Sequence, residues 1–366
     1  MMAASARRFT ADVVRGRSQG GIDLSPDLVA VLGSWSWEPP VVLGMLAASA
    51  LYALGWVRLS QRRRRPAHLA AWRAWCFAVG IGAIGLALLS PIGVFSQLFF
   101  FAHMTQHLLL VVAAAPLLLL GAPLLPMLWA LPRGLRLGIG RLFAPGSLLQ
   151  RLFGALTHPF VAGPLFIGML ALWHLPSFYD EAQGRTLVHD LEHLCFLGTA
   201  LLFWWPVIHP AGGRRRLSYG AAIPYLFFAM LEGNLIGALL TFADHPLYAT
   251  YQRVPRLWGI SLMQDQQMAG LIMWVPGGLA YFIPIFAVLA MLLKEEERAA
   301  RAAAAEAEAA PHGTSARAVP ADRVPGGPGA ALKTGGCRSG GAAADDGSMG
   351  EPSERRRAGG ADRPAR

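Results

Sequence analysis

The chain has 366 residues, of which 54% are hydrophobic and only 15% are charged. A typical soluble domain carries about 25% charged residues, so this composition indicates a protein that lies mainly in lipid. The net charge of +10 would suit nucleic acid as a partner if Lys and Arg gathered on an exposed polar face, but here the arginines separate apolar segments, which argues against that class.

Apolar segments long enough to cross a membrane follow one another along the chain. A helix needs about 20 mostly apolar residues to cross the ~30 Å hydrocarbon core. Seven segments qualify: residues 41–57, 74–90, 95–117, 160–178, 188–208, 220–242 and 266–293. Trp35, Trp37 and Trp56 flank the first, as expected for aromatic side chains at the two interfaces. The sequence therefore predicts an all-α, polytopic membrane protein with a seven-helix bundle over residues 35–293.

Three regions lie outside the predicted spans. Residues 1–34 contain no apolar core of signal-peptide length, and we expect them to form an external segment. In residues 118–159 apolar side chains alternate with Arg, which is typical of short helices in the membrane interface. Residues 294–366 are expected to form a cytoplasmic tail whose first part continues the last helix. The Ala-, Gly- and Pro-rich remainder should be mostly disordered, because it cannot bury enough apolar surface.

The arginines also predict the orientation, because short cytoplasmic loops retain Lys and Arg. Three alternate loops, residues 58–73, 118–159 and 209–219, contain thirteen Arg and no acidic residue. The loops on the other side contain three Arg, mixed with Asp and Glu. We therefore expect a multi-pass protein of the cell membrane with its N-terminus outside and its C-terminus in the cytoplasm.

The histidines are distributed unevenly between the two sides. Six of the ten fall in the outer half or outer loops: His103, His107, His174, His189, His193 and His245. His103 with His107, and His189 with His193, are spaced i,i+4, so each pair projects from one helix face. Two imidazoles on adjacent turns can bind one metal ion. The pattern predicts a metal or cofactor site formed by the first five of these histidines.

Other polar and sulfur-containing residues are expected near that level. A carboxyl group inside the membrane costs about 2.5–3.5 kcal/mol, so Glu232 should face the bundle and have a partner, for which His107 is the first candidate. Gln106, Asp265, Met104 and Met268 are expected to support the site. The alternative is purely structural, because buried polar side chains often hydrogen-bond between helices and Met commonly fills gaps in a core.

The donor types restrict the metal only in part. Imidazole suits zinc, copper and iron, thioether sulfur selects Cu(I), and a nearby carboxylate favours Zn(II) or Cu(II). Copper and zinc are therefore the leading candidates, with heme bound by two histidines as a third. Cys76, Cys195 and Cys337 show no CxxC spacing, so a cysteine-based site is not predicted, and Cys195 is expected to pack as a small apolar residue.

Over residues 35–292 the chain resembles the CtaG-type cytochrome c oxidase assembly factors, the multi-span family associated with caa-type oxidases. The resemblance rests on these residues: His103, Gln106, His107, Trp173, His174, Pro176, His189, Glu192, His193, Trp204, Trp205, Pro206, Asp265, Gln266, Gly270, Met273, Trp274 and Pro276. It implies a membrane protein needed to make active cytochrome c oxidase. Copper supply is the role it implies, with an oxidase subunit as the partner in the membrane and no enzymatic activity.

An enzyme is the main alternative. Seven-helix membrane hydrolases hold zinc with three histidines and an acid, and the metal lowers the pKa of its bound water to about 7. Here His189 and His193 with His103 or His174 would supply the ligands, and Glu232 or Asp190 the base. A heme-binding electron carrier is the third possibility.

Overall fold

The computed structural model describes residues 33–61, 70–210 and 217–309, and within these ranges helix is the only regular secondary structure. The elements are α3 (Pro39–Ser60), α4 (Ala71–Leu88), α5 (Pro91–Phe95), α6 (Phe100–Leu108), the π-helix η1 (Leu109–Ala114), α7 (Ala115–Leu120), α8 (Leu124–Ala130), α9 (Arg133–Leu142), α10 (Leu148–Leu156), α11 (Pro159–Trp173), α12 (Pro176–Gly184), α13 (Thr186–Ile208), α14 (Tyr219–Phe242), the 3-10 helix η2 (Thr250–Gln252) and α15 (Leu262–Ala309). The expected external segment and the disordered part of the tail lie outside the described residues.

The prediction of an all-helical, multi-span protein is confirmed. Six helices are long and apolar enough to cross a membrane: α3, α4 continued by α5, the continuous run α6–η1–α7, α13, α14 and α15. The expected span over residues 160–178 differs. Its helix, α11, has 15 residues and ends at Trp173, and it forms a pair with α10 that is bent by 62°. The bundle thus has six spans, or seven if the bent pair is counted as one.

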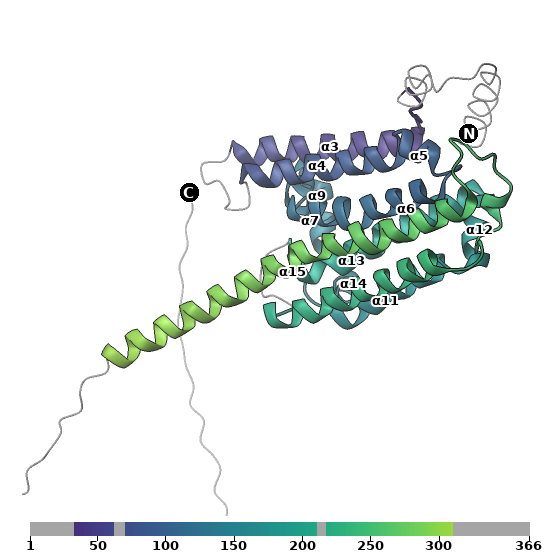
Figure 1. Cartoon of the computed structure of the whole chain (residues 1–366). Helices are drawn as coiled ribbons and strands as arrows, with labels where there is room; N and C mark the ends of the chain where they lie inside the picture. The colour runs from purple at the N-terminus through teal and green to yellow at the C-terminus, as the bar shows by residue number, and fades with distance from the viewer. Residues whose placement is uncertain (1–32, 62–69, 211–216, 310–366) are drawn as a thin grey trace, which may run out of the picture. The chain divides into compact units, whose positions relative to one another are not determined.

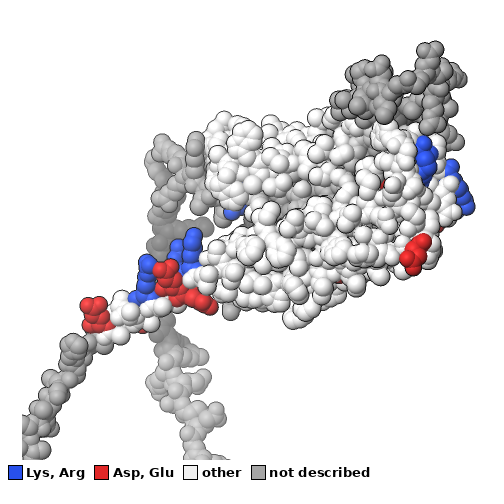
Figure 2. All heavy atoms as spheres, viewed as in Figure 1, with Lys and Arg blue, Asp and Glu red and all other residues white. Residues whose placement is uncertain are grey.

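The spans lie side by side in a bundle (Figure 1). On the face drawn in Figure 2, charged side chains lie at both ends and the wall between them is uncharged. Several large apolar side chains on the spans are more than half exposed, as expected for side chains that face lipid: Leu43, Phe228, Ile283 and Phe286. The short helices α9 and α10 bury none of their residues, which fits the interfacial character expected from their sequence.

The third span changes its winding in the middle. Pro116 has no backbone N–H and cannot bond to the preceding turn, and the π-helix η1 directly precedes it. The Trp204 Nε1–H group on α13 donates a 3.0 Å hydrogen bond to the carbonyl of Val111 in η1. This bond joins the third span to α13 and sets the rotation of α6 above it, because π-helical turns change the phase of the residues on either side.

Helices α14 and α15 pack closely along their length. A side chain at Gly237 would meet the carbonyl of Gly270 at 2.8 Å, and one at Gly270 would meet the carbonyl of Gly237 at 2.5 Å. Facing small residues let membrane helices approach closely, and here they bring the backbones of α14 and α15 together. Helix α15 then continues well beyond the apolar region to Ala309, as predicted for the start of the tail.

One end of the bundle is closed by α5, α12 and residues 243–261, and we call it the α12 end. The Asp180 carboxylate on α12 accepts hydrogen bonds from the backbone N–H groups of Ala249 and Thr250. The hydroxyl groups of Tyr179 and Tyr251 are 2.9 Å apart, and both side chains are 1% exposed. These contacts hold α12 against the connection between α14 and α15, so the polar end of the bundle is itself well packed.

Candidate metal centre

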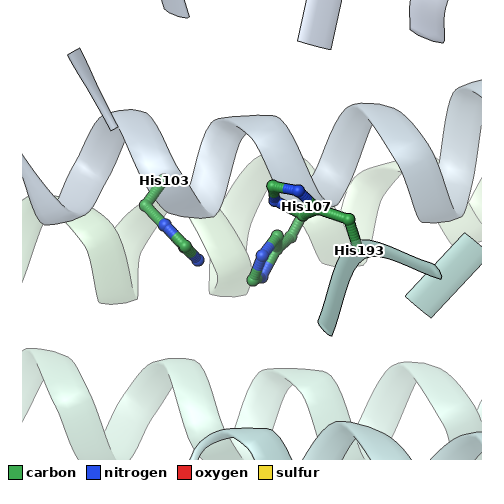
Figure 3. A group of neighbouring side chains, drawn as sticks. All are labelled: His103, His107 and His193. Atoms are coloured by element: carbon green, nitrogen blue, oxygen red, sulfur yellow. The ribbon is translucent and has the colours of Figure 1, made fainter. Parts of the chain in front are cut away.

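Four histidines from two facing spans come together beside the α12 end. Figure 3 shows that His103 and His107 come from one helix, α6, and that His193 reaches them from another, α13. The ring centroids of His103 and His107 are 4.2 Å apart, and those of His107 and His193 are 5.4 Å apart. His189 lies one turn earlier on α13, with its ring 5.4 Å from that of His103. The i,i+4 spacing puts each pair on one face, and packing turns the two faces toward each other.

Two overlapping sets of three donors result. One nitrogen each from His103, His107 and His193 lie within 4.8 Å of one another, and so do donor atoms of His103, His189 and Glu192. Donors around a tetrahedral ion at 2.0–2.1 Å lie about 3.3 Å apart, so either set could close on a metal through side-chain movements of about 1 Å. His103 belongs to both sets.

Glu192 is the carboxylate of this centre. Its Oε1 lies 3.7 Å from His103 Nε2 and 3.8 Å from His107 Nε2, and both Glu192 and His103 are 0% exposed. We expected Glu232 to be the partner of His107, and this is corrected. Among the described residues Glu232 lies within 4.0 Å of no histidine nitrogen, whereas Glu192 reaches two. The signal was present in the sequence, because Glu192 follows His189 by three residues and so lies on the same face of the helix.

The centre contains many polar atoms that the protein itself does not satisfy. Seven buried atoms have no hydrogen-bond partner among the described residues: His103 Nε2, His107 Nδ1 and Nε2, His189 Nε2, His193 Nε2, and Glu192 Oε1 and Oε2. Each unsatisfied buried group costs about 1–3 kcal/mol, so a cluster of this size is a candidate site for an ion or for ordered water. The donor set of imidazole nitrogens with one carboxylate fits a transition-metal ion.

Gln183 on α12 orients one of the ligands. Its side-chain amide nitrogen, Nε2, lies 2.9 Å from His103 Nδ1, so in this orientation the amide donates its N–H to the ring nitrogen. Metal-binding histidines usually donate the N–H of their second ring nitrogen to an oxygen, which leaves the first nitrogen free for the ion. A half-turn of the Gln183 amide would exchange its nitrogen for its oxygen, which would then accept the Nδ1–H and free Nε2, the nitrogen that faces Glu192. Sequence reasoning missed Gln183, because it lies outside the predicted spans.

The other predicted residues lie outside the two donor sets. His174 lies at the end of α11, and its Nδ1–H donates a 2.7 Å hydrogen bond to the carbonyl of Leu170. Gln106 is fully buried, and its amide has no hydrogen-bond partner among the described residues. Met104 is buried beside Phe100, whereas Met268 is 38% exposed, away from the histidine cluster.

Asp265 supports the centre by binding the first residues of α6, and it contacts none of the candidate metal ligands directly. Its carboxylate accepts hydrogen bonds from the N–H groups of Phe100 and Phe101, at 3.1 and 3.0 Å, and pairs with Arg256 at 3.0 Å. These N–H groups begin α6, where a carboxylate satisfies unpaired donors and complements the helix dipole. Asp265 thus fixes the start of the helix that carries His103 one turn later.

The geometry bears on the hydrolase alternative. The cavity beside His107 and His174 measures about 50 Å³. Of the bases expected for a hydrolase, Asp190 is exposed and Glu232 contacts none of the histidines. Cys195 packs against the apolar core, as predicted.

Comparison with known families gives a match. The profile of the cytochrome c oxidase caa3 assembly factor family matches residues 50–295. The chain belongs to this family. The matched region includes every residue of the histidine cluster, Glu192, Gln183 and most of the described bundle.

Relatives with curated sequences occur in mycobacteria. The chain is 27% identical over 291 residues to uncharacterized proteins of Mycobacterium bovis and Mycobacterium tuberculosis, covering 75% of this chain and 42% of each relative. It is 28% identical over 304 residues to an uncharacterized protein of Mycobacterium leprae, covering 80% and 44%. The chain thus spans less than half the length of these relatives. No solved structure matches it significantly.

Proposed function

We propose that this protein binds copper at the His–Glu cluster and supplies it to a cytochrome c oxidase subunit in the same membrane. The family assigns the protein to oxidase assembly. The observation that supports copper binding is the convergence of seven buried, unsatisfied donor atoms from four histidines and Glu192. Imidazole is a ligand for copper, and copper lies at the top of the affinity order of divalent first-row metals for such donors.

The two overlapping donor sets suggest how an ion could pass through the centre. Helix α13 runs away from the α12 end, so His189 and Glu192 lie nearer that end than His193. An ion held by His103, His189 and Glu192 can exchange the last two ligands for His107 and His193 while His103 stays bound. Transfer requires such exchangeable, incomplete coordination, unlike the closed four-ligand sites that hold structural metals.

We further propose that the α12 end faces the outside of the cell, as the arginine distribution predicts. Copper would then enter from the outer side. Reporter fusions at two exposed positions test this orientation: a fusion after Asp244 should report the outer side, and one after Gln61 the cytoplasm. The reverse result would contradict the orientation without affecting the metal site.

Variants of His103, which belongs to both donor sets, and of His193 test the proposed function. His103→Ala or His193→Ala should leave the protein inserted and abundant, because apolar packing and lipid hold the bundle, while oxidase activity falls and added copper partly restores it. His158→Ala is the matched control, since His158 is exposed at the start of α11. Normal oxidase activity in both ligand variants would overturn the copper-supply proposal. Purified protein that binds zinc but not copper would favour the hydrolase alternative instead.

A further inference from the structure

A second set of soft donors borders a cavity next to the histidine cluster. The cavity measures about 50 Å³ and lies further from the α12 end than His103. Three methionines from three different helices border it: Met104 from α6, Met230 from α14 and Met273 from α15. His107 and His174 complete this wall. We call these five residues the Met pocket.

The thioethers are not explained by gap filling alone. Methionine is common in cores because its flexible chain occupies irregular gaps and so removes cavities. Here Met104, Met230 and Met273 border a cavity that remains. A space of this size holds one or two water molecules or a single metal ion.

Two histidines that line the cavity, His107 and His174, have unpaired imidazole nitrogens. Both ring nitrogens of His107 and Nε2 of His174 are buried and have no hydrogen-bond partner among the described residues. Because His174 Nδ1 donates its hydrogen to the Leu170 carbonyl, its Nε2 carries a free lone pair. The lining of the pocket therefore combines thioether sulfur with imidazole nitrogen, and the nearby carboxylate is that of Glu192, 3.8 Å from His107 Nε2.

We propose that the Met pocket binds Cu(I) through Met104, Met230 and Met273, with His107 and His174 as the nitrogen ligands. Thioether ligands select Cu(I) among the biological metals. These five ligands are neutral, and the Glu192 carboxylate, 3.8 Å from His107 Nε2, supplies a nearby negative charge. The pocket thus discriminates through the softness of its ligands.

This inference rests on the proposed copper function and extends it to a second ion position. His107 belongs to the outer donor set with His103 and His193, and it also lines the Met pocket. A rotation of the His107 ring would pass an ion from the first position to the second without releasing it. The His–Glu cluster, with its carboxylate, accepts divalent ions, whereas the Met pocket should accept Cu(I) alone.

Metal titrations of the purified full-length chain test this proposal. Cu(I) under anaerobic, reducing conditions is titrated against a coloured Cu(I) chelator, Zn(II) against a zinc indicator, and Cu(I) ligation is read by X-ray absorption. The test variant is Met104→Leu/Met230→Leu/Met273→Leu, because Leu keeps the volume and each change costs less than about 1.5 kcal/mol. The control is Met127→Leu/Met169→Leu/Met268→Leu, which alters three methionines on helices α8, α11 and α15 that do not line the cavity.

We expect copper–sulfur scattering in the wild type and the control, and its loss in the test variant, with at least a tenfold fall in Cu(I) affinity and unchanged Zn(II) binding. Absence of copper–sulfur scattering in the wild type, or equal Cu(I) affinity in the two variants, would overturn the Met pocket. A His103→Ala/His193→Ala variant separates the two proposals. If it supports normal oxidase activity yet keeps copper–sulfur scattering, the supply function fails and the Met pocket stands.

Discussion

Glu192→Gln is the substitution that most directly tests the electrostatics of the candidate metal centre. The carboxylate is fully buried and lies 3.7 and 3.8 Å from the Nε2 atoms of His103 and His107. Glutamine has nearly the same shape and removes only the charge. The variant should therefore bind metal more weakly while the bundle stays folded.

The size of the effect follows from these distances. At about 4 Å and an effective dielectric constant of about 20, a unit charge interacts with a cation by about 4 kcal/mol per unit of cation charge. Burying the carboxylate offsets much of this, and removing a charged neighbour of a metal ligand typically weakens metal binding 10–100-fold. We expect a loss in that range for Zn(II) and Cu(II). The metal-free variant should unfold at the same or a higher temperature, because an unpaired buried charge has been removed.

The assay is a competition titration of Zn(II) and Cu(II) with a chelator of known affinity, together with thermal unfolding of the metal-free protein. Asp190→Asn is the matched control, since it removes the same charge from an exposed position two residues earlier on α13. If Glu192→Gln binds metal as tightly as the wild type, or if Asp190→Asn loses as much affinity, Glu192 has no special role in the centre.

Three further predictions concern the surroundings of the centre. Gln183→Leu should weaken metal binding about tenfold, because the His103 ring loses its hydrogen-bond partner. Gln183→Glu should bind metal at least as tightly as the wild type, because its carboxylate accepts the Nδ1–H of His103. Weaker metal binding by the Glu variant than by the Leu variant would contradict this role of residue 183. Asp265→Ala should lower the free energy of unfolding by about 3–5 kcal/mol, because Arg256 loses its carboxylate partner and the start of α6 loses its acceptor. A loss below about 1 kcal/mol in thermal unfolding would contradict this role. Burial raises the pKa of Tyr251 well above its usual value of 10.0, so the folded protein keeps this proton. The stability that the protonated Tyr251 side chain contributes is present below about pH 10 and is lost as the pH rises further. Tyr251→Phe should therefore reduce the loss of stability at alkaline pH, measured by chemical unfolding. An unchanged pH profile of stability in this variant would show that Tyr251 does not control that loss.

Much of this protein was predictable from the sequence because lipid imposes strong one-dimensional rules. The length of each apolar segment specified most of the spans, and the i,i+4 spacing placed His103 beside His107 and His189 beside His193 on their helices. The position of each pair along its span also indicated that the two pairs share one level. The exception was the segment ending near Pro176, where a 15-residue helix and a bend replace a straight span.

The sequence predicts how deep a residue lies along its span, but only the tertiary structure decided which way each helix face turns. Glu192 and Glu232 both lie within apolar segments, but only the packing of α13 against the third span brings Glu192 to His103 and His107. The packing of α15 against α14 and α6 placed Met273 on the cavity wall and left Met268 exposed. The rotation of a helix about its axis is set by contacts with its neighbours, such as the Trp204 bond to η1 and the close approach of α14 to α15, and these contacts join residues far apart in the sequence.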